Sequence, residues 1–426
     1  MTAVTVTAHT VEAWVLRQGA DRQGRAGNPG NPGGPGPGPG PGPAAPARLE
    51  LAEVDLGPIA DTEVLVEPIY GCWEGNMFHA LNRDPVDVCR QRGEPWVVIG
   101  NAGVVRVLRA GRSVPDRPEG SHCLVFPNAD PDPHGYMRRA YAYDATATIG
   151  LLARTTKIPA CALLPVPAGT RFTLRQWAAF SARYITAWSN WQVAHACWRS
   201  QMTEADQARP HVWAWGGGVA LAETTLAARL GADAAMISSR DARLAQIAAL
   251  GVVPIDRREF AELAYDPARY RTDPAYRAAY RAAEDRFLDI VDANTGGRRV
   301  SIFVDNIGLP VHRATLRALA RQGVLATCGW RHGMHLSTVR AVECIERHIH
   351  VHTHYARAAE GLAAIRYAEE TGWIPPDTTR VWSWHEVPAL AEQYRAGQVD
   401  DYFALYQINP DPNDPSEPPN RVQPAE

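Results

Sequence analysis

Three consecutive glycines stand between a short apolar run and a helical pattern. The run at residues 211–215 is aromatic and β-branched, which is typical of a strand buried on both faces. Apolar residues then recur at helical spacing over 219–230, and Gly231 predicts the end of the helix. Glycines let a backbone turn close to a ligand, and a helix N-terminus attracts phosphate. The stretch predicts a dinucleotide-binding unit. Its expected cofactor-binding residues are Gly216, Gly217, Gly218 and Val219.

Polar residues follow the next expected strand, residues 234–237. In NAD-binding units an acidic residue usually stands there and bonds the ribose 2′-OH. This chain has Ser238, Ser239 and Arg240 instead, and Asp241 comes one residue later. Two hydroxyls and a guanidinium suit a 2′-phosphate, so NADPH is the expected cofactor.

Two further apolar runs, residues 300–305 and 323–329, predict buried strands. In sheets of this kind ligands bind at the carboxyl ends of the strands. Asn306 and Gly329 are therefore expected to line the nicotinamide pocket. A glycine-rich turn without a ligand is the alternative, because the usual third glycine falls near Ala220.

The composition excludes several classes of protein. A length of 426 residues suits two or three domains of about 150 residues each. The net charge of -3 gives no reason to expect nucleic acid or an anionic membrane as a partner. No apolar run reaches the roughly 20 residues of a membrane helix, and the first residues lack a signal-peptide pattern. The seven cysteines form no CxxC pair, which predicts a reduced, cytoplasmic protein.

Many short strand patterns with glycine corners precede the glycine-rich unit, and Gly and Pro dominate residues 21–46. That segment is expected to be a disordered insert. The order of elements resembles the medium-chain dehydrogenase/reductase family. The resemblance implies an α/β protein with a GroES-like β-rich catalytic domain and a Rossmann domain built on a doubly wound parallel sheet. The expected bounds are 1–180 for the catalytic domain, 181–350 for the NADP-binding domain and 351–426 for a return to the catalytic domain. A homodimer or homotetramer is expected.

Zinc-binding members of this family carry ligands where this chain has Cys72 and the pair Asn101-Ala102. The resemblance therefore implies a zinc-free member, since a catalytic zinc needs at least three protein ligands. Cys72 is expected to be a packed thiol.

Histidines also occupy every second position from His348 to His354. On one strand the four imidazoles would share a face at about 6.6 Å spacing, too far apart to converge on one ion. We expect a hydrogen-bonded or interface row and no metal site.

Within the family, the chain resembles crotonyl-CoA reductase/carboxylase and its relatives. The resemblance rests on the insertion at residues 260–300, the run 353–356 with the helical pattern that follows it to Gly372, and the C-terminal stretch 382–398. It implies NADPH-dependent reduction of an α,β-unsaturated acyl thioester, bound to CoA or to a carrier protein, with or without carboxylation.

The catalytic residues of that subgroup are an aromatic-Glu pair, a His and an Asn. Their nearest matches are Tyr143 with Asp144, then His354, and Asn76 if the loop shifts by one residue. His354 is the expected acid for the α-carbon, and Asp144 would orient it or hold a water. The alternatives are a structural imidazole for His354 and a solvated carboxylate for Asp144.

Two other functions stay open. One is a zinc-free NADPH carbonyl or quinone reductase. The other is a degenerate dehydrogenase scaffold that binds a partner or ligand without redox turnover. Ala220 and the displaced Asn favour the scaffold, whereas Ser238, Arg240 and His354 favour the reductase.

Overall fold

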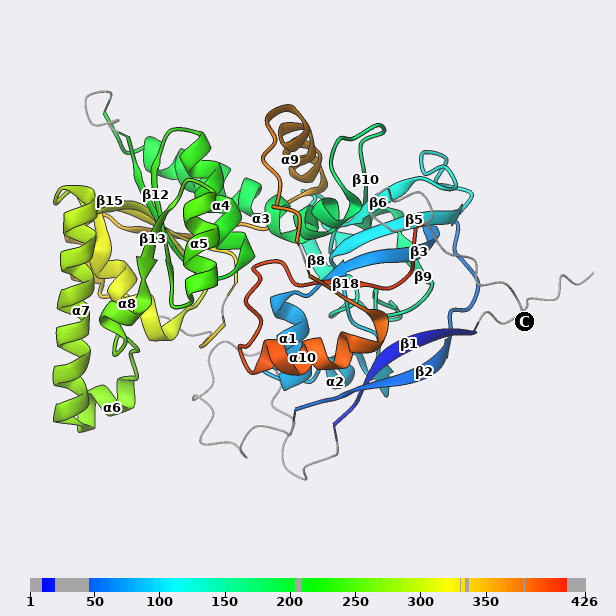
Figure 1. Cartoon of the computed structure of the whole chain (residues 1–426), viewed down its shortest axis with the longest axis horizontal. Helices are drawn as coiled ribbons and strands as arrows, with labels where there is room; N and C mark the ends of the chain where they lie inside the picture. Colours follow the sequence, from blue (N-terminus) through cyan, green and yellow to red (C-terminus); the bar gives the residue numbers. More distant parts are fainter. Residues whose placement is uncertain are drawn as a thin grey trace, which may run out of the picture.

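The computed structural model describes residues 10–19, 46–203, 209–329, 331–333, 337–378 and 380–411. The predicted Gly/Pro insert lies outside these residues except for Pro46. The elements of a parallel sheet gather at one end of the molecule, and the antiparallel strands gather at the other (Figure 1). No helix in the described part of the chain combines the length and apolarity needed to cross a membrane.

The largest sheet of the β-rich part is mainly antiparallel. Its central strand β3 (Glu63–Cys72) pairs with β5 (Gly103–Ala110), with β9 (Thr156–Pro159) and with β18 (Leu405–Gln407). Because β18 comes from the far end of the chain, the C-terminal region packs into the sheet that the N-terminal region begins. The other elements here are β1 (Thr10–Arg17), β2 (Leu49–Asp55), α1 (Gly75–Asn82), α2 (Val88–Arg92), β4 (Trp96–Val97), β6 (His122–Val125), β7 (Asn128–Pro131), β8 (Met137–Ala140), η1 (Ala160–Ala162), β10 (Leu163–Pro165), α9 (Ala358–Thr371), β17 (Val381–Trp382), η5 (Trp384–Glu386) and α10 (Val387–Arg395).

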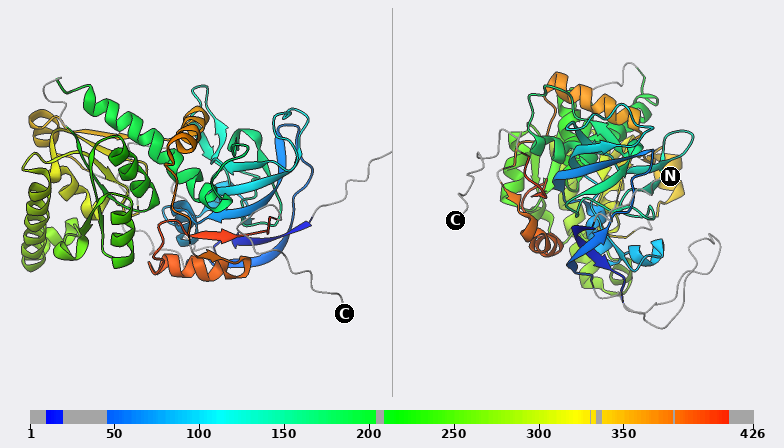
Figure 2. Two further views of the ribbon diagram at one scale, coloured as in Figure 1. Left: turned by 45° about the horizontal axis from the view of Figure 1, so that its top comes forward. Right: turned by 90° about the vertical axis from the view of Figure 1, so that its right-hand side faces the viewer.

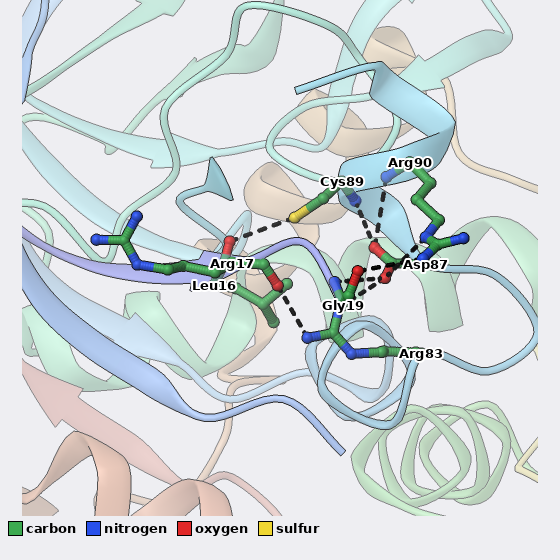
Figure 3. Close-up of polar contacts among 7 residues, drawn as sticks. All are labelled: Leu16, Arg17, Gly19, Arg83, Asp87, Cys89 and Arg90. Atoms are coloured by element: carbon green, nitrogen blue, oxygen red, sulfur yellow. Dashed lines mark hydrogen bonds and ion pairs between the residues drawn. The ribbon is translucent and has the colours of Figure 1, made fainter. Parts of the chain in front are cut away.

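Asp87 fastens the end of β1 to α2 (Figure 3). Its carboxylate caps the helix by accepting hydrogen bonds from the N–H groups of Cys89 and Arg90, at 3.1 and 3.4 Å. It also accepts the Gly19 N–H at 3.1 Å and pairs with Arg83 at 2.6 Å. The chain is therefore anchored where it leaves β1.

The parallel sheet has the strand order β13-β12-β11-β14-β15-β16. Alternate residues of β11 (His211–Trp215) face two separate cores. Val212 and Ala214 pack with α3 (Leu174–Arg199) and α4 (Gly218–Arg229), whereas Trp213 and Trp215 pack on the opposite face. Helices thus cover both faces, which confirms the doubly wound sheet. Its other elements are β12 (Asp233–Ser238), α5 (Asp241–Ala249), β13 (Val253–Asp256), η3 (Arg257–Phe260), α6 (Pro267–Thr272), α7 (Pro274–Thr295), β14 (Val300–Asp305), α8 (Leu309–Ala318), β15 (Leu319–Thr327), η4 (Arg340–Glu346) and β16 (His350–Thr353).

The helix α3 runs along the molecule between the two parts (Figure 2). It begins in a capping box in which Thr173 and Gln176 bond each other's backbone N–H groups. Along its length it contacts β5 of the β-rich part and β15 of the parallel sheet. Residues on α3 can therefore contact both parts of the molecule.

Candidate active site

Predicted cofactor and acid residues, together with the unpredicted Cys328, follow directly after neighbouring parallel strands. Gly216 follows β11, Asn306 follows β14, Cys328 follows β15 and His354 follows β16. The register pairs the last residues of β11 and β14 with each other, and likewise those of β15 and β16. The carboxyl ends of these strands therefore bring the four residues to one edge, where ligands bind in such sheets.

The glycine turn is open at its middle residue. Gly216 has φ of +135°, a conformation that favours glycine. Gly217 is the N-cap of the twelve-residue α4, is exposed, and would carry a Cβ with no atom within 4 Å. A Cβ on Gly218 would instead lie 2.8 Å from Arg183 Cδ and 2.9 Å from Phe403 Cε1. A ligand can thus reach the backbone at Gly217, while Gly218 is needed for close packing.

Val219 and Ala220 complete the start of α4. Val219 is half-buried against the core, and Ala220 is fully buried. The Ala220 Cβ lies 3.3 Å from the position that a Cβ on Gly216 would take. A small side chain is therefore required at the position of the usual third glycine, and alanine meets that requirement.

Arg240 reaches a carboxylate from the C-terminal part of the chain. Its guanidinium pairs with Asp400, while Ser238 Oγ accepts the Arg240 N–H at 3.5 Å and Ser239 is exposed. Asp400 and Phe403 both belong to residues 399–403, which we name the closing segment. Arg240 is thus directed toward the same segment that touches the glycine turn.

The end of β14 carries a buried donor without a partner. Asn306 Oδ1 accepts hydrogen bonds from the N–H of Cys328 at 3.0 Å and from its Sγ at 3.3 Å. Asn306 Nδ2 is buried and bonds no other described residue. Burial raises the pKa of the Cys328 thiol, which stays protonated. Gly329 is half-buried, with open space at its Cβ position. A buried unpaired N–H is costly, and a polar ligand would satisfy it.

His354 is buried, with 9% of its surface exposed. Its Nε2 lies 3.1 Å from one oxygen of Glu360 and 3.3 Å from the other. The Tyr136 ring stands edge-on to the imidazole at 5.6 Å between centroids. The carboxylate that orients this imidazole therefore comes from the first turn of α9.

The expectation that Asp144 orients His354 is not met. The Asp144 carboxylate accepts the N–H of Ala140, and no hydrogen bond or ion pair within the described ranges joins it to His354. Tyr143 is half-buried, and burial together with the Asp144 charge raises its pKa to about 12. The short Asp144 side chain bonds the backbone of its own turn. A glutamate, which is one methylene longer, could more easily extend beyond that turn.

The histidine row does not form one strand face. The strand β16 contains His350 and His352 only, while His348 precedes it with φ of +53° and His354 follows it. Across the described part of the chain, no group of three or more His, Cys, Asp or Glu side chains is arranged to hold a metal ion.

Asn76 faces Asn101 across the β-rich side of the site. Its Nδ2 donates to Asn101 Oδ1 at 3.1 Å, and its own Oδ1 is buried with no partner among the described residues. Cys72 is fully buried, as expected of a packed thiol, and burial raises its pKa. The first turn of α1 therefore carries an amide with an unused acceptor.

Sequence reasoning missed a buried ion pair beside the glycine turn. Arg183 Nε donates to Glu74 at 3.1 Å, and its other nitrogens donate to the carbonyls of Trp73 and Tyr402. The side chains are 5% and 13% exposed for Arg183 and Glu74. Burial raises the pKa of Glu74 against the opposing effect of Arg183. The only sequence signal was Arg183 itself, the single charged residue between Arg175 and Arg199 in the aromatic and small-residue helix α3.

No protein-family model matches the chain, and no curated protein matches it in sequence. Solved structures match over nearly the whole length. A crotonyl-CoA carboxylase/reductase, AntE, in complex with NADP has a TM-score of 0.72 at 20% identity, covering 96% of this chain and 98% of its own. The 2-octenoyl-CoA carboxylase reductase CinF, in complex with NADP and 2-octenoyl-CoA, has a TM-score of 0.71 at 20% identity, covering 94% and 88%.

An alcohol dehydrogenase from Pyrobaculum aerophilum is also similar, with a TM-score of 0.67 at 16% identity, covering 94% of this chain and 100% of its own. At these identities the likeness shows the fold. The chain has the fold of the medium-chain dehydrogenase/reductases, and the predicted resemblance to crotonyl-CoA carboxylase/reductases is confirmed at the level of fold.

Proposed function

We propose that the protein is an NADPH-dependent reductase of an α,β-unsaturated acyl thioester, bound to CoA or to a carrier protein. The observation that carries the proposal is the open turn at Gly217, between a buried parallel strand and a twelve-residue helix. Such a turn presents N–H groups and the positive end of a helix dipole to phosphate. The NADP and 2-octenoyl-CoA in the neighbouring structures support the choice of cofactor and substrate class.

The residues present fit the cofactor. The turn and first helical residues, Gly216, Gly217, Gly218 and Val219, would hold the pyrophosphate. Ser238, Ser239 and Arg240 would hold the adenosine phosphate, and Asn306 and Gly329 would border the nicotinamide. The unpartnered N–H of Asn306 could donate a hydrogen bond to the amide oxygen of the nicotinamide.

Bound NADPH would supply a hydride for the β-carbon of the substrate. Negative charge then develops on the thioester oxygen, and the α-carbon needs a proton. We assign that proton to His354, held by Glu360, because the imidazole lies at the same sheet edge as Asn306. Asn76, Tyr143 and Asp144 are proposed to border the acyl group from the β-rich part.

A scaffold without redox turnover is the second candidate. Arg183 and Phe403 lie against Gly218, and Asp400 pairs with Arg240, so a dinucleotide must enter a site whose groups already have partners. A carbonyl or quinone reductase would share the cofactor site and differ in its substrate. A cytoplasmic homodimer or homotetramer stays a proposal; the absence of CxxC pairs supports a reducing compartment.

Nucleotide binding tests the observation that carries the proposal. We expect fluorescence titration to show NADPH binding about tenfold or more tightly than NADH. In the Gly217→Val variant NADPH binding should be lost, because the side chain fills the open turn, while adenosine 2′-monophosphate, which needs only the far end of the site, still binds. An equal melting temperature is the control for folding. Failure of the wild type to bind any dinucleotide contradicts the proposal.

Turnover then identifies the reaction. NADPH consumption is measured with a panel of enoyl-CoA esters, with and without bicarbonate, and in parallel with quinones and aldehydes. Consumption with an enoyl-CoA supports the proposal, and its dependence on bicarbonate decides carboxylation. Consumption with quinones or aldehydes alone supports the carbonyl or quinone reductase. Binding without consumption supports the scaffold.

A further inference from the structure

The closing segment runs from Arg240 and Arg243, at the expected adenosine end, to the glycine turn. At the adenosine end, Arg243 donates to the carbonyls of Val399 and Asp400, at 3.0 and 2.9 Å. Its guanidinium also lies over the Tyr402 ring at 4.8 Å from the centroid. At the other end, Phe403 meets Gly218. The segment is therefore held in place by α5 while it presents the Asp400 side chain to Arg240.

Carboxylates already neutralise Arg240 and the nearby Arg258. Arg258 pairs with Asp241, the residue after Arg240, and with Asp256, each at 2.6 Å. Arg240 pairs with Asp400. A 2′-phosphate that binds Arg240 must therefore approach the Asp400 charge or displace it, whereas NADH has only an uncharged 2′-hydroxyl at this position and leaves the pair intact.

The exposure of the Arg240–Asp400 pair makes it easy to displace. The side chains are 30% and 62% exposed, and ion pairs at such sites contribute little to stability. A phosphate carries more charge than a carboxylate and offers more acceptor oxygens to a guanidinium. The pair therefore lowers the affinity for a 2′-phosphate without preventing its binding.

We propose that Asp400 is an internal competitor for Arg240 and limits how strongly the protein prefers NADPH over NADH. The inference rests on the proposed cofactor. It adds a specificity-determining residue that sits on the C-terminal part of the chain, about 160 residues from the arginine it controls. Removal of the Asp400 charge is expected to free Arg240 for the phosphate and to leave the backbone contacts of Arg243 in place.

The test compares Asp400→Asn with Asp401→Asn, which removes the neighbouring charge, and measures dissociation constants for NADPH and NADH by fluorescence. Asp400→Asn should bind NADPH about three- to tenfold more tightly and NADH unchanged, with a smaller gain at high salt. Asp401→Asn should change either constant by no more than about twofold. In the Arg240→Gln background, Asp400→Asn should give no gain, because the guanidinium it frees is gone.

The outcomes separate this inference from the proposed function. If the wild type prefers NADPH, and Asp400→Asn binds NADPH with the same or lower affinity, the inference is wrong and the proposed function stands. If the wild type binds no dinucleotide, the proposed function fails and the inference fails with it. An equal gain in NADPH affinity in Asp401→Asn also overturns the specific role of Asp400, because the loss of any negative charge in this region would then explain the gain.

Discussion

At the scale of single residues, the proton donor is the assignment that decides the chemistry. The His354→Gln side chain can still bond Glu360 but cannot transfer a proton. We expect kcat with an enoyl-CoA ester to fall about 100-fold or more, with the dissociation constant for NADPH unchanged. The control is His350→Gln, which alters an exposed imidazole at the start of β16, the strand that leads to His354, and should keep full activity. The measurement is steady-state NADPH consumption.

Full turnover by the His354→Gln variant would remove His354 from this role. Glu74 would then be the next acid to test, because its side chain is 13% exposed and Arg183 places it beside Gly218. A Glu74→Gln variant that loses activity while it still binds NADPH would reassign the donor.

The place of a residue could be predicted where a single element determines it. The partner of a side chain could not be predicted where that partner comes from a second element. Gly217 and Asn306 follow from strand patterns alone, and the rule that ligands bind at carboxyl ends placed them together. The partner of Arg240 lies about 160 positions away, and no local pattern indicates which carboxylate reaches it. Likewise Glu360, rather than Asp144, meets His354, because α9 begins directly after the strand that carries the histidine.

At the scale of elements, the contact between α3 and α4 contains a buried carboxyl that makes stability depend on pH. Glu223 is fully buried, and Asn190 Nδ2 donates to its two oxygens at 3.0 and 3.3 Å. Burial raises the pKa of Glu223 to about 8, from an ordinary value of 4.5. Between these values the folded protein keeps a proton that the unfolded chain releases, so stability falls as pH rises.

The Glu223→Gln variant should remove this dependence. We expect the wild type to lose up to about 1.4 kcal/mol of unfolding free energy per pH unit from this group between pH 5 and 8. The variant should show a flatter profile and exceed the wild type at pH 8. Urea unfolding at each pH measures the difference, and exposed Glu53→Gln is the control. A parallel profile in Glu223→Gln and wild type would contradict a protonated, buried Glu223.

Element types and order were predictable because each follows from local periodicity. The buried strands β11 and β14 both appear where the apolar runs predicted them. The four histidines from 348 to 354 do not all lie on one strand, because pairing with β15 limits β16 to residues 350–353. Periodicity predicts which face a residue would take on a strand, but the neighbouring strand decides how long the strand is.

At the scale of the whole molecule, Arg183 ties together regions that are remote in sequence. From α3 it reaches Trp73 and Glu74 of the β-rich part, Tyr402 of the closing segment and Gly218 at the start of α4. The domain bounds at 180 and 350 stay predictions. The pairing of β18 with β3 places the C-terminal region beside the N-terminal sheet, and Arg183 connects that assembly to the parallel sheet.

Loss of this arginine should therefore weaken the whole fold. Arg183→Met leaves the Glu74 carboxylate and two carbonyls without their donor, and removing one partner of a buried pair costs about 3–5 kcal/mol. We expect urea unfolding to show a loss of this size, with partial recovery in Arg183→Met/Glu74→Met, which buries no lone charge. The control is Arg175→Met. Arg175 lies on the same helix as Arg183, and its pair with Asp377 is more exposed, so the free energy of unfolding should fall by about 1 kcal/mol or less. Equal costs at the two positions would mean that Arg183 is no more than a surface-type pair, and that the two parts are held together by apolar packing along α3.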